Sequence, residues 1–100
     1  MPQTLTTIRS TLALRKQELS DTFFVHRLAV FGSMASGMER EGSDIDMLVE
    51  FTRPVGWEIF DLNDYLEQLL QRKVDLTTPA ALKPLIREEI LQTTQEVYST

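Results

Sequence analysis

The sequence predicts a small α/β (α+β) domain in which helices cover a mixed sheet of three or four strands. Apolar residues recur at helical spacing in three separate segments, which is typical of amphipathic helices. Short runs rich in β-branched and aromatic residues lie between these segments, as is usual for buried strands. The loop between the first two strands is too short for a crossover helix. These strands should therefore pair antiparallel, which makes the sheet mixed.

The first two elements are predicted to be a helix and a buried strand. Residues 4–19 should be helical, with Thr4 as a suitable N-cap. The apolar stripe of this helix consists of Leu5, Ile8, Leu12 and Leu19. Residues 23–31 are rich in β-formers and end in four consecutive apolar residues, 28–31. This pattern indicates a buried strand.

The next two elements are a half-buried strand and a core-facing helix. Apolar and polar side chains alternate over residues 44–51, so one face of this strand should be buried. Residues 57–72 place five apolar side chains on one arc of about 100°, which is typical of a helix packed on the core. Trp57 and Phe60 lie off this arc. They either pack against the preceding loop or form a contact patch for a partner.

The end of the chain is predicted to form a short strand and a final helix. Residues 73–77 make the strand, with Asp75 between two apolar residues. Pro79 and Pro84 frame the start of the helix, which should help to cover the sheet. Its apolar stripe consists of Leu82, Leu85, Ile86 and Ile90. Residues 95–98 are compatible with a closing edge strand or with a frayed end.

Composition and charge restrict the class of protein. One hundred residues are enough for one domain, residues 1–100, with one core. There is no cysteine, no leader-like segment and no apolar run near the roughly 20 residues of a membrane span, so we expect a cytoplasmic protein that does not enter membranes. The net charge of −5, with scattered Lys and Arg, argues against direct nucleic-acid binding. A nucleotide can still bind through a metal ion and a few backbone N–H groups.

A Gly-Ser turn followed by paired carboxylates is the pattern that points to chemistry. Gly32 lets the backbone turn and approach a ligand, and Ser33 can offer its N–H and hydroxyl to a phosphate oxygen. Alternate strand residues share a face, so Asp44 and Asp46 should point the same way, with Cα atoms roughly 6.5–7 Å apart. Two carboxylates held that close repel one another unless a cation lies between them. We therefore predict a site for a nucleotide with bound Mg²⁺.

A third acidic residue, Asp75, either faces solvent on an open sheet face or joins this site. With two carboxylates already in need of a metal ion, we favour the second interpretation. Three carboxylates can hold two Mg²⁺ ions, one that binds the triphosphate and one that lowers the pKa of an attacking hydroxyl. Nucleotidyl transfer has this requirement.

The segment that begins at Gly32 resembles the signature of nucleotidyltransferases of the DNA polymerase β superfamily: Gly-Ser, ten residues, then Asp-x-Asp. It is most similar to the minimal bacterial members, the MNT-domain antitoxins. The similarity covers nearly the whole chain and includes the leading helix and residues 26–33, 43–51, 73–79 and 82–87. It implies the nucleotidyltransferase fold for the entire domain.

The resemblance also implies roles for individual residues. Asp44 and Asp46 would bind both metal ions, and Asp75 would complete the metal site on the nucleophile side and assist deprotonation. Gly32 and Ser33 would hold the triphosphate of ATP. The partner of this family is an all-helical HEPN ribonuclease toxin, with which a hetero-oligomer can form. The reported type of reaction is transfer of AMP from ATP to a tyrosine of that toxin, so the resemblance implies a protein adenylyltransferase that acts as an antitoxin.

One departure from the family pattern keeps other functions open. The family usually has Arg where this chain has Ser36, and loss of a guanidinium near a triphosphate removes a contact of about 1.5–3 kcal/mol. Arg40 is a hypothetical substitute. An alternative is therefore a catalytically weak or inactive antitoxin that neutralises its partner by binding. Transfer to RNA or to a small molecule such as an antibiotic is a third function, disfavoured by the negative charge and the lack of an accessory domain.

Overall fold

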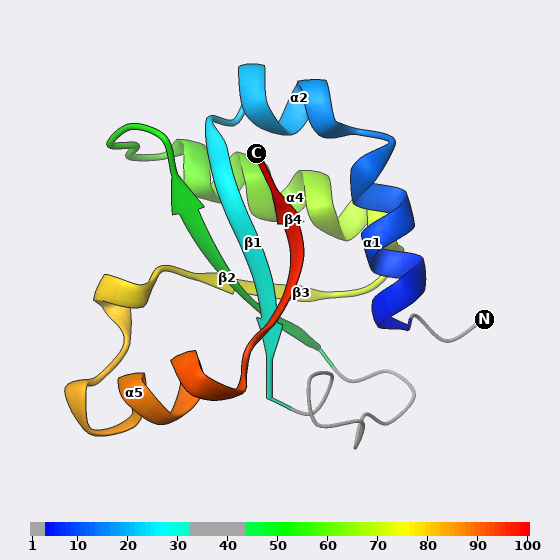
Figure 1. Ribbon diagram of the computed structural model, residues 1–100. Coiled ribbons are helices and arrows are strands. Elements are labelled where there is room, and N and C mark those ends of the chain that lie inside the picture. The colour runs from blue at the N-terminus through cyan, green and yellow to red at the C-terminus, as the bar shows by residue number, and fades with distance from the viewer. Residues whose placement is uncertain (1–3, 33–43) are drawn as a thin grey trace.

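Helices pack against one four-stranded sheet in the computed structural model, which describes residues 4–32 and 44–100 (Figure 1). In chain order the elements are α1 (Leu5–Ala13), α2 (Lys16–Asp21), β1 (Val25–Phe31), β2 (Ile45–Phe51), α4 (Glu58–Leu70), β3 (Val74–Thr77), the 3-10 helix η1 (Pro79–Ala81), α5 (Pro84–Thr93) and β4 (Gln95–Ser99). None of the helices in these residues combines the length and the apolar character that crossing a bilayer requires.

The sheet is mixed, as the sequence predicted, and its strand order is β3-β2-β1-β4. β1 runs antiparallel to β2 and to β4, whereas β2 runs parallel to β3. The end of the chain, for which the sequence left two states open, forms the edge strand β4. The predicted fold class, a small mixed sheet with covering helices, is confirmed.

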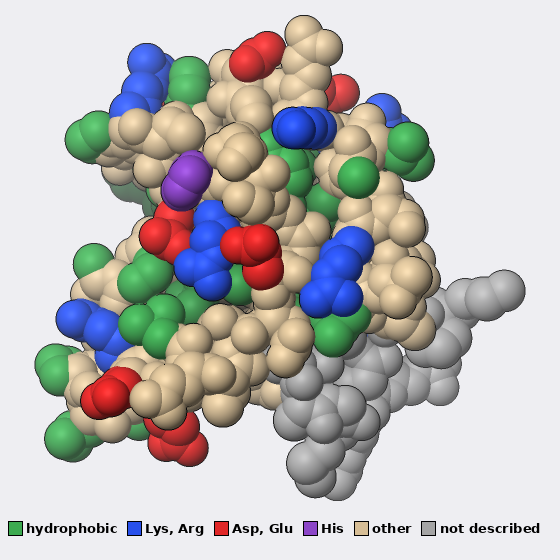
Figure 2. Space-filling view, viewed as in Figure 1, with side chains coloured by type: hydrophobic (Ala, Val, Ile, Leu, Met, Phe, Trp, Pro, Cys, Tyr) green, Lys and Arg blue, Asp and Glu red, His purple; other side chains and the backbone are tan. Residues whose placement is uncertain are grey.

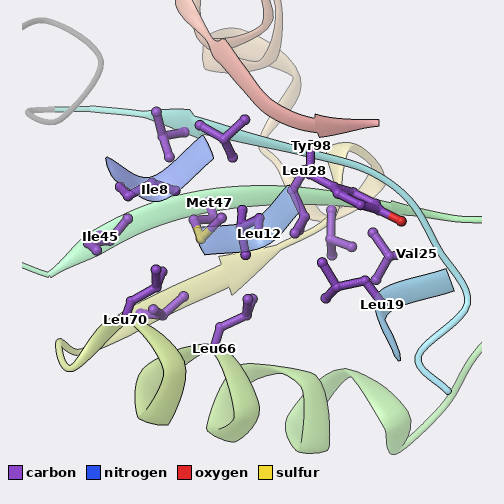
Figure 3. Packing of buried hydrophobic residues seen from close by; sticks show 14 of the residues in the cluster. Ile8, Leu12, Leu19, Val25, Leu28, Ile45, Met47, Leu66, Leu70 and Tyr98 are labelled. Atoms are coloured by element: carbon purple, nitrogen blue, oxygen red, sulfur yellow. The ribbon is translucent and has the colours of Figure 1, made fainter. Parts of the chain in front are cut away.

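One face of the sheet and three helices enclose the hydrophobic core (Figure 3). The fully buried side chains include Ile8 and Leu12 of α1, Leu19 of α2, Leu62, Leu66 and Leu70 of α4, and Leu28, Val30, Met47 and Val49 of the two central strands. Burying a side chain of this size contributes about 1.5–3 kcal/mol. Because alternate strand residues face opposite sides of a sheet, the residues between these core positions lie on the other face.

The first predicted helix, residues 4–19, is divided by the structure into α1 and α2. Thr4 is the N-cap as predicted, and its Oγ1 accepts a hydrogen bond from the Thr7 N–H at 3.1 Å. To continue after Leu12, the apolar stripe would need an apolar residue at position 15 or 16, and both positions carry basic side chains. The chain changes direction between the two helices (Figure 1), and Leu19 is thereby buried against the sheet.

The prediction that the last helix covers the sheet with an apolar stripe is wrong, because α5 has no buried residue. Leu85 is 96% exposed, and Ile86 is also exposed. The apolar spacing predicts the helix itself, but it does not specify which element, if any, covers the apolar face. The guanidinium of Arg87 helps to hold α5 instead, because it donates hydrogen bonds to the carbonyls of Ala80 and Leu82.

Tyr98→Phe is expected to lower the free energy of unfolding by about 1 kcal/mol. Tyr98 is buried in β4, where its hydroxyl lies 2.8 Å from Ser20 Oγ and donates to the Lys16 carbonyl at 3.3 Å, which ties β4 to α2. Urea unfolding followed by circular dichroism measures the change. Ser20→Ala is a milder control, because the bond to Lys16 remains. A Tyr98→Phe midpoint equal to that of the wild type would contradict this assignment.

The face of the sheet opposite the core carries charged side chains, which gather over β1 in Figure 2. Arg27 of β1 lies between Glu50 of β2 and Glu96 of β4, at 2.7 and 2.8 Å. These side chains are partly exposed, so each pair contributes at most about 1 kcal/mol. Their main effect is to join three strands in one register. Asp46 and Glu50 are four residues apart on β2 and therefore share this face.

Candidate functional site

Asp46 and Asp75 are direct neighbours across two parallel strands. Asp46 of β2 and Asp75 of β3 are register partners, and the Ile45 N–H donates to the Lys73 carbonyl at 2.9 Å just before them. Adjacent strands lie roughly 4.8 Å apart, and register partners project from the same face. The structure thus brings together two of the three acidic residues that the sequence singled out.

The environment of Asp46 disfavours the ionised form of its carboxyl group relative to the neutral form. Burial raises the pKa of the half-buried Asp46 carboxyl, and the negative charges of Asp75 and then Asp44 raise it further. Asp44 is exposed and lies immediately before β2. All three effects would be offset by a cation bound among the carboxylates. An acid whose pKa is raised by burial and by neighbouring carboxylates is a candidate functional residue.

Gly32 lies against the Asp46 carboxylate at the end of β1. Its φ of +71° is in the left-handed region, which other residues rarely adopt. A Cβ added at Gly32 would be 2.7 Å from Asp46 Oδ2, which is too close for any side chain. The sequence predicted that this glycine permits close approach to a ligand, and the structure shows close approach to an acid of the site. Ser33, Ser36 and Arg40 lie outside the described residues.

The carboxylates fit a magnesium ion that shares its coordination with a substrate. Within residues 4–32 and 44–100, no three acidic or histidine side chains come close enough together to form a metal-binding cluster. Mg²⁺ does not need one, since in nucleotide sites it is usually bound by one or two carboxylates, phosphate oxygens and water. Asp46 and Asp75 could supply hard oxygen ligands of this type, because they occupy adjacent register positions.

Polar side chains of α4 hold the outer edge of β3, on which Asp75 lies. The Val74 N–H donates to Glu67 Oε2 at 2.9 Å, and the Leu76 N–H donates to Asn63 Oδ1 at 3.2 Å. These two α4 residues were not among the predicted site residues. Their spacing of four on an otherwise apolar helix face is the signal that could have identified them.

A cleft of about 400 Å³ opens beside Asp75, between α4, β3 and η1. Its lining consists of Ile59, Phe60, Asn63, Val74, Asp75, Leu76, Thr77, Thr78 and Ala81. Phe60 is 61% exposed and lies next to Trp57, which is 81% exposed, with ring centroids 5.6 Å apart. These aromatic rings are therefore not buried against the preceding loop, which was one of the two possibilities left open by the sequence.

Comparisons with known proteins agree on one family. The profile described as "Nucleotidyltransferase domain" matches residues 12–97. Protein adenylyltransferase MntA of Thermococcus cleftensis is 40% identical over 90 residues, which are 89% of this chain and 91% of that protein.

Solved structures match over nearly the whole chain. A candidate minimal nucleotidyltransferase superposes with a TM-score of 0.75 at 34% identity, covering 92% of this chain and 94% of the other. A structure of the tri-AMPylated HEPN toxin of Shewanella oneidensis in complex with its MNT antitoxin gives a TM-score of 0.66 at 14% identity, covering 96% of this chain and 73% of the matched chain. At that identity the second match shows the fold alone.

Proposed function

Because the chain belongs to the nucleotidyltransferase domain family, we propose that it transfers AMP from ATP to a tyrosine hydroxyl of a HEPN-domain toxin and thereby acts as an antitoxin. The observation that carries this proposal is the pair Asp46 and Asp75, in register on one sheet face beside the Gly32 turn. The name of the Thermococcus relative supports AMP as the transferred group, and the AMPylated HEPN toxin in a structural neighbour supports the partner.

Each residue of the site has a separate proposed role in the reaction. Two Mg²⁺ ions held by Asp44, Asp46 and Asp75 would neutralise the triphosphate and lower the pKa of the attacking hydroxyl. Gly32 lets the turn after β1 lie against the Asp46 carboxylate. The turn is proposed to hold the triphosphate, with Ser33 binding it through its N–H and hydroxyl. Asp75 is exposed beside the cleft, where it can orient the tyrosine hydroxyl and accept its proton.

The chemical balance of the transfer is simple. The tyrosine oxygen forms a bond to the α-phosphorus of ATP, and the bond from that phosphorus to the bridging oxygen breaks. Pyrophosphate leaves with the electron pair, and the hydroxyl proton passes to Asp75. We expect the reaction to take place in the cytoplasm, within a hetero-oligomer of the two proteins and without direct binding of nucleic acid.

An intact-mass spectrum of a candidate HEPN toxin tests the proposal. After incubation with this protein, ATP and Mg²⁺, the HEPN protein is expected to gain a whole number of AMP units. The gain should disappear when EDTA removes the metal, because the carboxylates alone cannot neutralise the triphosphate. It should also disappear when the α,β-methylene analogue replaces ATP. An unchanged mass in the complete mixture would rule the proposed reaction out.

Neutralisation by binding, with little or no catalysis, is a second candidate function. Ser36, in place of the family's Arg, favours it, since a contact with the triphosphate is lost. The Asp44→Asn/Asp46→Asn double variant distinguishes the two functions in cells that produce the HEPN protein. Loss of neutralisation at equal abundance of the variant supports catalysis, whereas full protection supports binding.

A further inference from the structure

The glycine turn, the two carboxylates and the cleft lie in this order across the sheet, from β1 to the outer side of β3. Gly32 directly follows β1, Asp46 lies on β2 and Asp75 on β3, and these three strands are consecutive in the sheet. The cleft lined by Asp75, Phe60 and Ala81 comes next, on the outer side of β3. The two carboxylates therefore lie between the glycine turn and the cleft.

This order fits the geometry of an in-line displacement. In such a reaction the attacking oxygen and the leaving group lie on opposite sides of the transferred phosphorus. If the triphosphate lies at the turn, the attacking hydroxyl must approach from the β3 side. We propose that the cleft between α4, β3 and η1 binds the acceptor tyrosine of the partner protein, with Phe60 as the residue that determines specificity. This inference rests on the proposed function.

The chemistry of the lining suits a neutral aromatic ring that carries a hydroxyl. The volume of about 400 Å³ lies in the range of pockets that enclose a small ligand. Asp75 is the charged group among the lining residues, so a phosphate would be repelled there. The other lining groups are apolar side chains, two threonines and Asn63. A tyrosine ring can pack against Phe60 while its hydroxyl points toward Asp75.

The capped edge of β3 requires the acceptor to enter as a side chain. The outward N–H groups of Val74 and Leu76 are already bound by Glu67 and Asn63. A partner segment that added a strand to this edge would need these same N–H groups. The backbone of the partner therefore remains outside, and only its side chain reaches the carboxylates.

The exposed pair Trp57 and Phe60 provides the contact surface at the mouth of the cleft. Phe60 lines the cleft, and Trp57 extends the aromatic surface away from it. Solvent-exposed aromatic residues beside a pocket are typical of the few residues that dominate an interface. The partner segment that carries the tyrosine should therefore pack on these two rings.

Kinetics of AMP transfer to the HEPN protein tests this assignment. Phe60→Ala removes the ring and Ala81→Phe fills the cleft; both residues are exposed, so both variants should fold. Each is expected to raise the KM for the HEPN protein roughly tenfold or more, with an unchanged KM for ATP. Leu14→Ala is the matched control, since this leucine is 84% exposed and is not part of the cleft. Acceptor KM values equal to that of the wild type in both variants would overturn the inference.

A second measurement needs no transfer reaction. N-acetyl-tyrosinamide, added to the ¹⁵N-labelled protein, is expected to shift the amide resonances of Thr77, Thr78 and Ala81, and the Ala81→Phe variant should lose these shifts. N-acetyl-serinamide should cause none. Shifts confined to other parts of the protein would overturn the cleft assignment. Absence of AMP transfer by the wild type would instead overturn the proposed function, so the two failures are distinguishable.

Discussion

Asp46→Asn is expected to remove AMP transfer while it raises the stability of the metal-free protein. Asp46 lies at the centre of the site, between the Gly32 turn and Asp75, so loss of its charge should reduce the transfer rate by roughly 10²–10³-fold or more. The same change removes a half-buried negative charge that two other carboxylates repel. We expect a gain of about 0.5–2 kcal/mol in the free energy of unfolding at neutral pH.

The pH dependence of this gain follows from the direction of the pKa shift. The folded-state pKa of Asp46 is raised above its ordinary value of 3.8 by burial, by Asp75 and by Asp44. Stabilisation from the protonated carboxyl is therefore present below pH 3.8 and is lost as the pH rises through the raised pKa. Asparagine does not titrate, so the stability difference between variant and wild type should grow from acidic to neutral pH.

Urea unfolding in EDTA, at a series of pH values, measures this difference. Asp64→Asn is the control, because it removes an exposed carboxylate of α4 and should change stability by less than about 0.5 kcal/mol. Adding Mg²⁺ and ATP should stabilise the wild type more than Asp46→Asn, because stabilisation grows with the affinity of the folded state for the ligand and the variant lacks one carboxylate of the site. A wild type that equals the variant in stability at neutral pH would contradict the electrostatic account.

Gly32→Ala is expected to fold but to lose most of its AMP transfer. The added Cβ would be 2.7 Å from Asp46 Oδ2 and would require a φ of +71°. The left-handed conformation costs about 1–2 kcal/mol in a residue with a side chain. Relief of the close contact must turn the Asp46 carboxylate or shift the Gly32 backbone, and a displacement of about 1 Å in such a site can reduce the rate about 10²-fold. Thermal unfolding and the initial rate of AMP transfer measure the two effects.

Gly56→Ala is the matched control for this substitution. A Cβ at Gly56 would meet only Glu58 Oε2, at 3.9 Å, which is ordinary contact. The variant should therefore keep its transfer rate and lie within about 0.5 kcal/mol of the wild type in stability. A Gly32→Ala protein as active as Gly56→Ala would mean that the position of Asp46 does not depend on the glycine turn.

Local sequence patterns were enough to predict most elements but not how they pack. The alternation along β2 and the apolar arc of α4 lead directly to a strand and a helix, because each pattern has the period of its element. The break between α1 and α2 and the exposure of α5 were not predicted. The break coincides with Arg15 and Lys16, where the apolar stripe of α1 is interrupted. The exposure of α5 depends on which elements pack against it, and sequence periodicity does not specify that.

At the site, too, the sequence predicted some features and only the tertiary structure decided the others. The sequence by itself determined the types of residue, a glycine turn and three acids, and hence the expectation of a cation bound with a nucleotide. Only the tertiary structure decided that Asp46 and Asp75 are register partners, that Gly32 lies against Asp46, and that a cleft opens beyond β3. Strand order and register arise from contacts between segments far apart in the chain, so no local pattern specifies them.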